Sequence, residues 1–207
     1  MVFTKGMQKL AGLEALCERY RELGIDASIL PEDSPEAMKQ GIIKQDMGYI
    51  KVKGMNFDLA TVRTGGTTRG GYSTKMGGIT MASKEKIPFQ YHHIVRTHLA
   101  DEDTVKAKLK KKRKGLFNRE IASVTWQGGS MAATLNSQTE LNRAIMNFIT
   151  PEDSLEVVPD RKNNAVRIVF ARPAELRAGL LQGFKFDRRL MPRETIDAIN
   201  QIAGLIR

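Results

Sequence analysis

The sequence has a single cysteine, Cys17, among its 207 residues. One cysteine cannot form an internal disulfide, and such sparing use is typical of proteins in a reducing compartment. No apolar run approaches the roughly 20 residues that a membrane-spanning helix needs. Residues 1–9 lack the apolar core of a secretory signal. We therefore predict a cytoplasmic protein without a transmembrane segment.

Signatures of enzyme and metal chemistry are missing as well. With one cysteine and three histidines, the chain cannot supply the cysteine-rich spacings of zinc sites. Gly129-Ser130 does not complete the G-x-S-x-G turn of a nucleophilic serine. Acidic pairs such as Glu152 and Asp153 stand where carboxylates cap helices or solvate turns. The sequence accordingly predicts no catalytic residue, no metal site and no cofactor.

Aromatic residues make up only 6% of the chain. Five of them interleave with basic residues between positions 47 and 96: Tyr49, Phe57, Tyr72, Phe89 and Tyr91. Exposed rings at such positions would stack on the bases of a single-stranded nucleic acid. We expect them instead in the core of a sheet, because no string of the RNA-recognition type is present.

Positive charge is abundant and concentrated in one third of the chain. Residues 47–114 hold 15 Lys and Arg against 5 Asp and Glu, whereas residues 1–46 carry a net charge of −2 and residues 115–207 a net charge of +2. The total of +10 therefore belongs to one segment, and such segregation attracts anionic partners.

The densest part of this segment runs from Lys106 to Lys114, with seven cations in nine residues. It predicts a phosphate-contacting segment, with a merely solvated surface as the alternative. The cations expected to attract a polyanion are Lys106, Lys108, Lys110, Lys111, Lys112, Arg113 and Lys114. Those expected to help set its register are Arg63, Arg69, Lys75 and Arg96. Nucleic acid is slightly favoured over an anionic membrane surface, because no basic amphipathic helix is evident.

A glycine-rich stretch from Gly65 to Gly78 is the second feature. Glycine lets backbone N–H groups approach a ligand closely, and the stretch also carries hydroxyls, Arg69 and Lys75. It lacks the order of a phosphate-binding loop and is followed by a strand-like segment, which favours a hairpin connection. An enzyme acting on a phosphorylated small molecule held near this loop is the alternative function.

The histidines give no metal site. On an extended strand His92 and His93 point to opposite faces, and His92 and His98 lie about 20 Å apart. His92, Arg96 and His98 would line one edge and add positive charge at low pH. Ordinary strand histidines are the favoured interpretation.

Periodicity divides the chain at about residue 47. Apolar residues at three- and four-residue steps predict a helix from Met7 to Leu23 that Gly24 ends. A linker over 26–46 with a short helix starting at Pro35 follows. Self-association through the Met7–Leu23 helix, or through an open sheet edge, would make the protein a scaffold that forms homo-oligomers. Strands are expected at Tyr49–Lys53, Phe57–Arg63, Gly78–Ala82 and Phe89–Thr97.

The C-terminal part predicts the order β-β-α-β-β-α-α. One hairpin joins Ile121–Trp126 to Met131–Leu135, and a helix begins at the capping box of Ser137 and Glu140. A second hairpin joins Leu155–Val158 to Val166–Phe170, before helices at Pro173–Gln182 and Pro192–Leu205.

The fold class is thus α+β, with an antiparallel sheet built from hairpins, helices on one face and an N-terminal amphipathic helix. The expected division is an N-terminal helix with an acidic linker (1–46) and one domain (47–207). That domain combines a basic, glycine-rich β portion (47–114) with the remainder (115–207).

Overall fold

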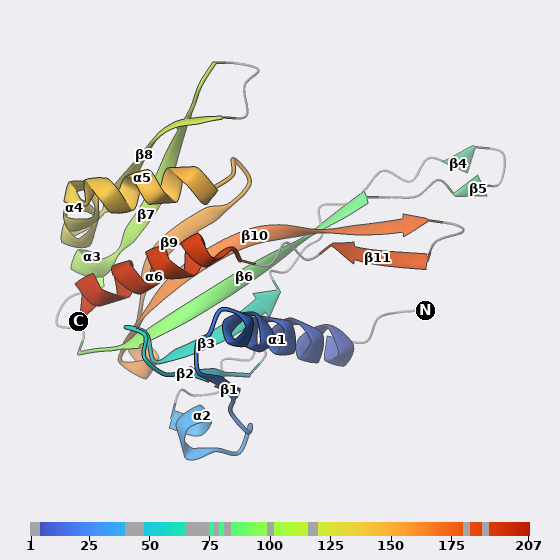
Figure 1. Ribbon diagram of the computed structural model, residues 1–207, viewed down its shortest axis with the longest axis horizontal. Helices are drawn as coiled ribbons and strands as arrows, with labels where there is room; N and C mark the ends of the chain where they lie inside the picture. The colour runs from blue at the N-terminus through green and yellow to red at the C-terminus, as the bar shows by residue number, and fades with distance from the viewer. Residues whose placement is uncertain are drawn as a thin grey trace.

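One large antiparallel sheet organises the chain (Figure 1). The computed structural model describes residues 5–39, 48–64, 75–76, 79–80, 84–98, 102–115, 120–179, 183–187 and 191–207. Across the sheet the strands are β1 (Ala27–Ile29), β2 (Ile50–Val52), β3 (Leu59–Thr64), β6 (Lys84–Arg96), β10 (Ala165–Gly179), β9 (Ser154–Asp160), β7 (Ala107–Arg113) and β8 (Ile121–Gly128). β11 (Gly183–Asp187) pairs with the end of β10, and β4 (Lys75–Met76) pairs with β5 (Ile79–Thr80).

Most helices cover one face of this sheet, which we call the inner face. They are α1 (Lys5–Glu22), α4 (Ser130–Ser137), α5 (Thr139–Phe148) and α6 (Arg193–Ile206). The short α2 (Pro35–Lys39) lies on the other, outer face, where Ala37 packs with Leu59 and Ile94. α3 (Glu102–Val105) precedes β7, and a single 3-10 turn, η1 (Arg161–Asn163), joins β9 to β10. No helix in the described part of the chain is long and apolar enough to cross a membrane.

The N-terminal helix is part of the core. From its predicted stripe Leu13, Leu16, Cys17 and Tyr20 are buried, while the side chains of Met7 and Leu10 lie outside the described residues. The hydroxyl of Tyr20 lies 2.8 Å from Nε2 of His93, the inward-facing histidine of β6. Phe57 packs edge-on against the same imidazole, with 4.9 Å between ring centres. This helix therefore docks on its own sheet, which leaves the buried stripe unavailable for self-association.

Several predicted elements are confirmed. The α+β class and the antiparallel sheet are present, α2 starts at Pro35, and Ser34 accepts a bond from the amide of Ala37. The hairpin of β9 and β10 and the last helix, α6, also lie where the pattern puts them. The predicted linker is wrong in one respect, because residues 27–29 pair with β2 as a strand.

Three predictions in the C-terminal part are wrong. The segment expected to be the strand Met131–Leu135 lies in helix α4, so no hairpin forms around residues 127–130. Ser137 does not cap a helix but ends α4, and Gln138 occupies the N-cap of α5. The expected helix Pro173–Gln182 is replaced up to Gly179 by strand β10, which pairs with β6 as far as Arg177 and with β11 from Glu175 onward.

Helix α4 begins where two glycines let β8 pass close to the start of β7. The amide of Gly129 donates to the carbonyl of Lys106 at 2.8 Å. A Cβ on Gly128 would overlap that carbonyl, and one on Gly129 would overlap the carbonyl oxygen of Asp103. This close approach of the two backbone segments therefore requires residues without side chains.

We predict that Gly129→Ala lowers the free energy of unfolding by about 2–3 kcal/mol, because the α3–β7 backbone must move to admit the methyl group. Gly115→Ala is the control, since its Cβ meets no atom and only the φ of +73° is strained, at about 1 kcal/mol. Urea unfolding measures both. Equal losses in the two variants would contradict the close approach.

Candidate polyanion-binding surface

The cation run Lys106–Lys114 forms strand β7 rather than a helix or a loop. Successive side chains on a strand point to opposite faces. Ala107 and Leu109 are buried on the inner face, whereas Lys108, Lys110 and Lys112 are exposed on the outer face. We call these three residues the lysine row. Their spacing along the strand is roughly 6.8 Å per step of two residues.

A row of uncharged polar side chains lies beside the lysine row on β8. The register pairs Lys108 with Gln127, Lys110 with Thr125 and Lys112 with Ser123. Because directly paired residues share a face, these three residues, which we call the polar row, also lie on the outer face. Gln127 and Thr125 are exposed and Ser123 is half-buried. The two rows together are the ribbon face.

Only part of this positive charge is neutralised by neighbouring acids. Lys106 pairs with Asp103 at 2.9 Å and Lys108 with Glu156 at 2.6 Å, and both lysines remain more than half exposed. Within the described residues, no carboxylate lies at ion-pair distance from Lys110, Lys112, Arg113 or Lys114. Exposed cations without an acid beside them are available to an external anion.

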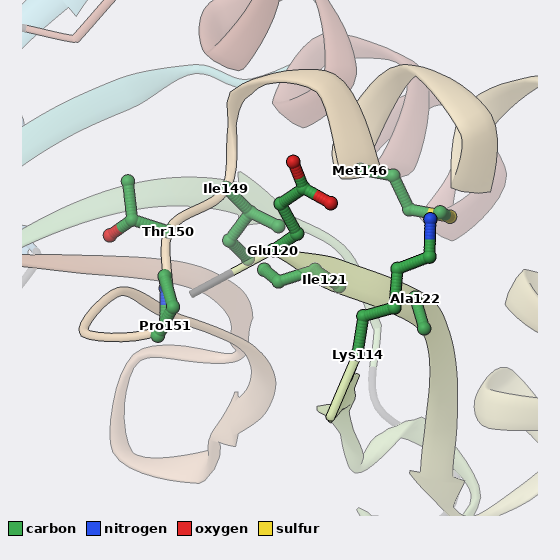
Figure 2. A pocket seen from close by; sticks show the side chains of 8 residues that line it. All are labelled: Lys114, Glu120, Ile121, Ala122, Met146, Ile149, Thr150 and Pro151. Carbon is green, nitrogen blue, oxygen red and sulfur yellow. The ribbon is translucent and has the colours of Figure 1, made fainter. Parts of the chain in front are cut away.

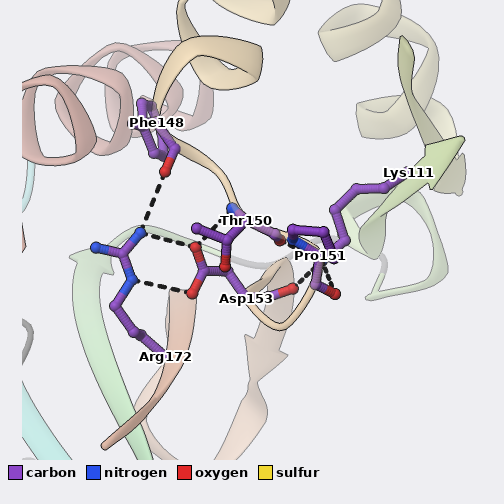
Figure 3. Close-up of polar contacts among 6 residues, drawn as sticks. All are labelled: Lys111, Phe148, Thr150, Pro151, Asp153 and Arg172. Atoms are coloured by element: carbon purple, nitrogen blue, oxygen red, sulfur yellow. Dashed lines mark hydrogen bonds and ion pairs between the residues drawn. The ribbon is translucent and has the colours of Figure 1, made fainter. Parts of the chain in front are cut away.

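Lys111 faces the other way and is not part of this surface (Figure 3). Its ammonium donates to the backbone carbonyls of Thr150 and Pro151, each at 3.0 Å, and to that of Asp153. Burial lowers the pKa of Lys111, while the carboxylate of Asp153 acts in the opposite direction. Although the sequence groups Lys111 with its neighbours, the structure uses it to fasten β7 to the turn after α5.

Asp153 holds that turn in place. Its buried carboxylate accepts two bonds from Arg172 on β10, at 2.9 and 2.7 Å, and one from the amide of Thr150 at 2.8 Å. Arg172 also donates to the carbonyl of Phe148, the last residue of α5. The turn is therefore tied to the sheet on both sides, as Figure 3 shows.

An open pocket of about 540 Å³ lies between the start of β8 and the end of α5 (Figure 2). Its lining is Lys114, Glu120, Ile121, Ala122, Met146, Ile149, Thr150 and Pro151. Aliphatic side chains dominate, with one cation and one carboxylate among them. The titratable side chains of the lining are those of Lys114 and Glu120, and it contains no histidine or cysteine.

Two of the remaining predicted cations, Arg63 and Arg96, have described side chains, and neither lies at the lysine row. Arg63 lies on β3, four strand spacings or about 19 Å away across the sheet. Arg96 is exposed at the end of β6 that the register places away from Lys112, and its amide donates to Asp58. Arg69 lies outside the described residues, and of Lys75 only the backbone in β4 is described. The glycine-rich stretch is therefore not tested as a ligand loop.

A buried ion pair on the outer face was not predicted from the sequence. Arg167 on β10 is buried with Asp160 of β9, at 2.5 Å, and His92 lies nearby on β6. Burial lowers the pKa of His92 to about 2, and the positive charges of Arg63 and Arg167 add to the effect. The expectation that His92 adds positive charge at low pH is thus wrong. Among the described residues, no three His, Cys, Asp or Glu side chains gather as a metal site.

Comparison of the chain with protein-family models, with curated proteins and with solved structures finds no match. The functional argument therefore rests on the geometry and charge of the residues above.

The same substitution at two adjacent lysines of β7 should change stability by very different amounts. We predict that Lys111→Met lowers the free energy of unfolding by about 1–3 kcal/mol, because three carbonyls lose a charged donor. Lys110→Met removes an exposed charge without such partners and should change stability by less than about 0.5 kcal/mol. Urea unfolding of both variants tests this, and equal effects would contradict the assignment of the two faces.

Acid should destabilise the fold through His92 and His93. Burial lowers the pKa of His93 to about 3, so both imidazoles are neutral when folded. The unfolded chain takes up their protons below about pH 6.5. The contribution of these two histidines to the free energy of unfolding is therefore fully present above about pH 6.5. It is lost as the pH falls toward 3, by up to about 1.4 kcal/mol per pH unit for each histidine.

Urea midpoints at pH 7 and pH 5 measure this dependence. His92→Gln should make it shallower, and His98→Gln, at an exposed position outside the sheet, serves as the control. A dependence that His92→Gln leaves as steep as in the wild type would exclude His92 as a source.

Proposed function

We propose that the chain binds polyanions, nucleic acid foremost, through the ribbon face. The observation that carries this proposal is the alternation of β7, which places Lys108, Lys110 and Lys112 in one exposed row. Lysines at regular spacing of this size can contact successive phosphates of one strand. Each phosphate that they neutralise releases counterions, and this release favours binding at low salt.

The composition of the ribbon face supports nucleic acid over an anionic membrane. Peripheral membrane binding joins basic charge to apolar side chains that enter the lipid. The large hydrophobic residues exposed in the described part of the chain are Ile29 and Leu205. Neither belongs to β7 or β8, so this surface offers phosphate contacts without an apolar anchor. Binding to anionic vesicles but not to nucleic acid would reverse this assignment.

Phosphate contacts of this kind need no catalytic group, so the proposal is a non-enzymatic binding module. A cytoplasmic setting suits a chain with a single cysteine. The alternative is an enzyme acting on a phosphorylated small molecule near Gly65–Gly78, a stretch of which the structure describes only Lys75 and Met76. A self-associating scaffold is less supported. The edge strand β8 has its backbone at Trp126 bonded in both directions by Asn136, at 2.8 Å each, which blocks pairing there.

Replacement of the lysine row should weaken binding to nucleic acid. We predict that Lys108→Gln, Lys110→Gln and Lys112→Gln together reduce affinity for a mixed-sequence duplex at least tenfold at ~0.1 M salt. They should also reduce the slope of log K against log salt by about 2 to 3, because each lost phosphate contact removes about 0.9. Fluorescence anisotropy across a salt series measures both quantities.

The control variant also loses three positive charges, at Arg143 of α5, Lys162 of η1 and Arg193 of α6, which are all exposed and do not belong to the ribbon face. Replacing these with glutamine should leave the salt slope close to that of the wild type. If both variants lose affinity equally, net charge and not the ribbon face drives binding. If neither does, the proposed function fails.

A further inference from the structure

The ribbon formed by β7 and β8 stands apart from the sheet along most of its length. β7 pairs with β9 only at Ala107 and Lys108, whereas its pairing with β8 continues to Arg113. Beyond Lys108 the chain is therefore a two-stranded ribbon, which projects at the upper left of Figure 1. Helices α4 and α5 lie against its inner face, and its outer face carries the lysine row and the polar row.

We propose that this ribbon enters the major groove of duplex DNA, with the polar row directed at base edges and the lysine row at phosphates. The inference rests on the proposed function and names its substrate class. The major groove of B-form DNA is about 12 Å wide and admits a two-stranded β-ribbon. Strands separated by about 4.8 Å fit this width together with their side chains.

The residue types of the polar row are those that distinguish base pairs. A glutamine side chain can bond N6 and N7 of adenine together, serine and threonine bond several base edges, and a threonine methyl can contact the methyl group of thymine. Gln127, Thr125 and Ser123 stand at alternate positions of one strand, beside a cation at each level. In this arrangement the polar row, which would contact bases, runs parallel to the lysine row, which would contact phosphates.

Contacts on the inner face fix the backbone from which these side chains project. The indole N–H of Trp126 donates to Asn142 of α5 at 2.9 Å, and Lys111 is fastened to the turn after that helix. Asn136 of α4 bonds the backbone of Trp126. A surface fixed before binding loses less conformational entropy on contact.

Other nucleic acids suit this surface less well. The major groove of A-form RNA is too narrow for side chains to read. Single strands are held largely by stacking on aromatic rings, and neither row of the ribbon face contains an aromatic residue. We therefore expect the order duplex DNA, then single-stranded DNA or duplex RNA.

The first measurement compares three probes of equal length and sequence: duplex DNA, duplex RNA and single-stranded DNA. Duplex DNA should bind at least tenfold more tightly than duplex RNA at the same salt. Dimethyl sulfate, which methylates guanine N7 in the major groove, should find protected guanines in the bound DNA duplex. Equal affinity for the two duplexes, or N7 atoms that stay reactive when protein is bound, would overturn the inference.

The second measurement selects sequences from a randomised DNA duplex pool. Ser123→Ala, Thr125→Val and Gln127→Ala together should change or abolish the preferred sequence while the salt slope stays within about 1 of the wild type. At one adenine contact we expect about tenfold lost discrimination. The control replaces Ser137, Gln138 and Thr139, the same three residue types at the α4–α5 junction, and should keep the wild-type preference.

These outcomes separate the two proposals. Loss of binding in the lysine-row variant together with an unchanged sequence preference in the polar-row variant retains polyanion binding and rejects groove reading. Binding that is insensitive to the lysine row rejects both. Thermal unfolding of each variant confirms that the fold is retained before binding is interpreted.

Discussion

The ammonium of Lys111, held by the carbonyls of the turn after α5, determines which side of β7 is free. Because side chains alternate on a strand, fixing one lysine inward places its neighbours on the outward face. Asp153 makes this anchor rigid, since it joins the turn to Arg172 in the middle of the sheet. Removing one partner of such a buried pair is costly, because the other charge is left without compensation.

Elements that depend on interactions between residues close together in the sequence were predicted correctly. The Ser34–Pro35 start of α2, the β9–β10 hairpin and helix α6 each follow from capping, turn or periodic residues. The strand expected at residues 131–135 is wrong because a short, largely apolar segment suits either structure. The helix expected from Pro173 is wrong for another reason, since residues 174–178 are the helix formers Ala, Glu, Leu, Arg and Ala but form a strand. In the second case β10 pairs with residues 84–88 of β6, far away along the chain, and from Glu175 onward also with the nearby β11. No local pattern contains the pairing with β6.

The position of the candidate surface along the chain could be predicted from the sequence. The faces on which its side chains lie, and their partners, could not. Charge density pointed to residues 106–114, and the structure distributes them over two faces with different partners. The inclusion of Arg63 depended on the order of strands, which places four strand spacings between it and Lys110. The buried pair of Arg167 and Asp160 left no signal in composition, because an arginine and an aspartate seven residues apart are common on any surface.

The pairing of β6 with β10 also bears on how the chain is made. Phe170 lies 79 residues after its partner Tyr91, whereas β3, on the other side of β6, precedes it. Synthesis of the intervening residues takes about 4–16 s at roughly 5–20 residues per second. Throughout that interval one edge of β6 has no strand beside it, and helix α6, which also packs against β6, has not yet been made. The nascent chain thus depends most on protection from aggregation while the middle of its sequence is being translated.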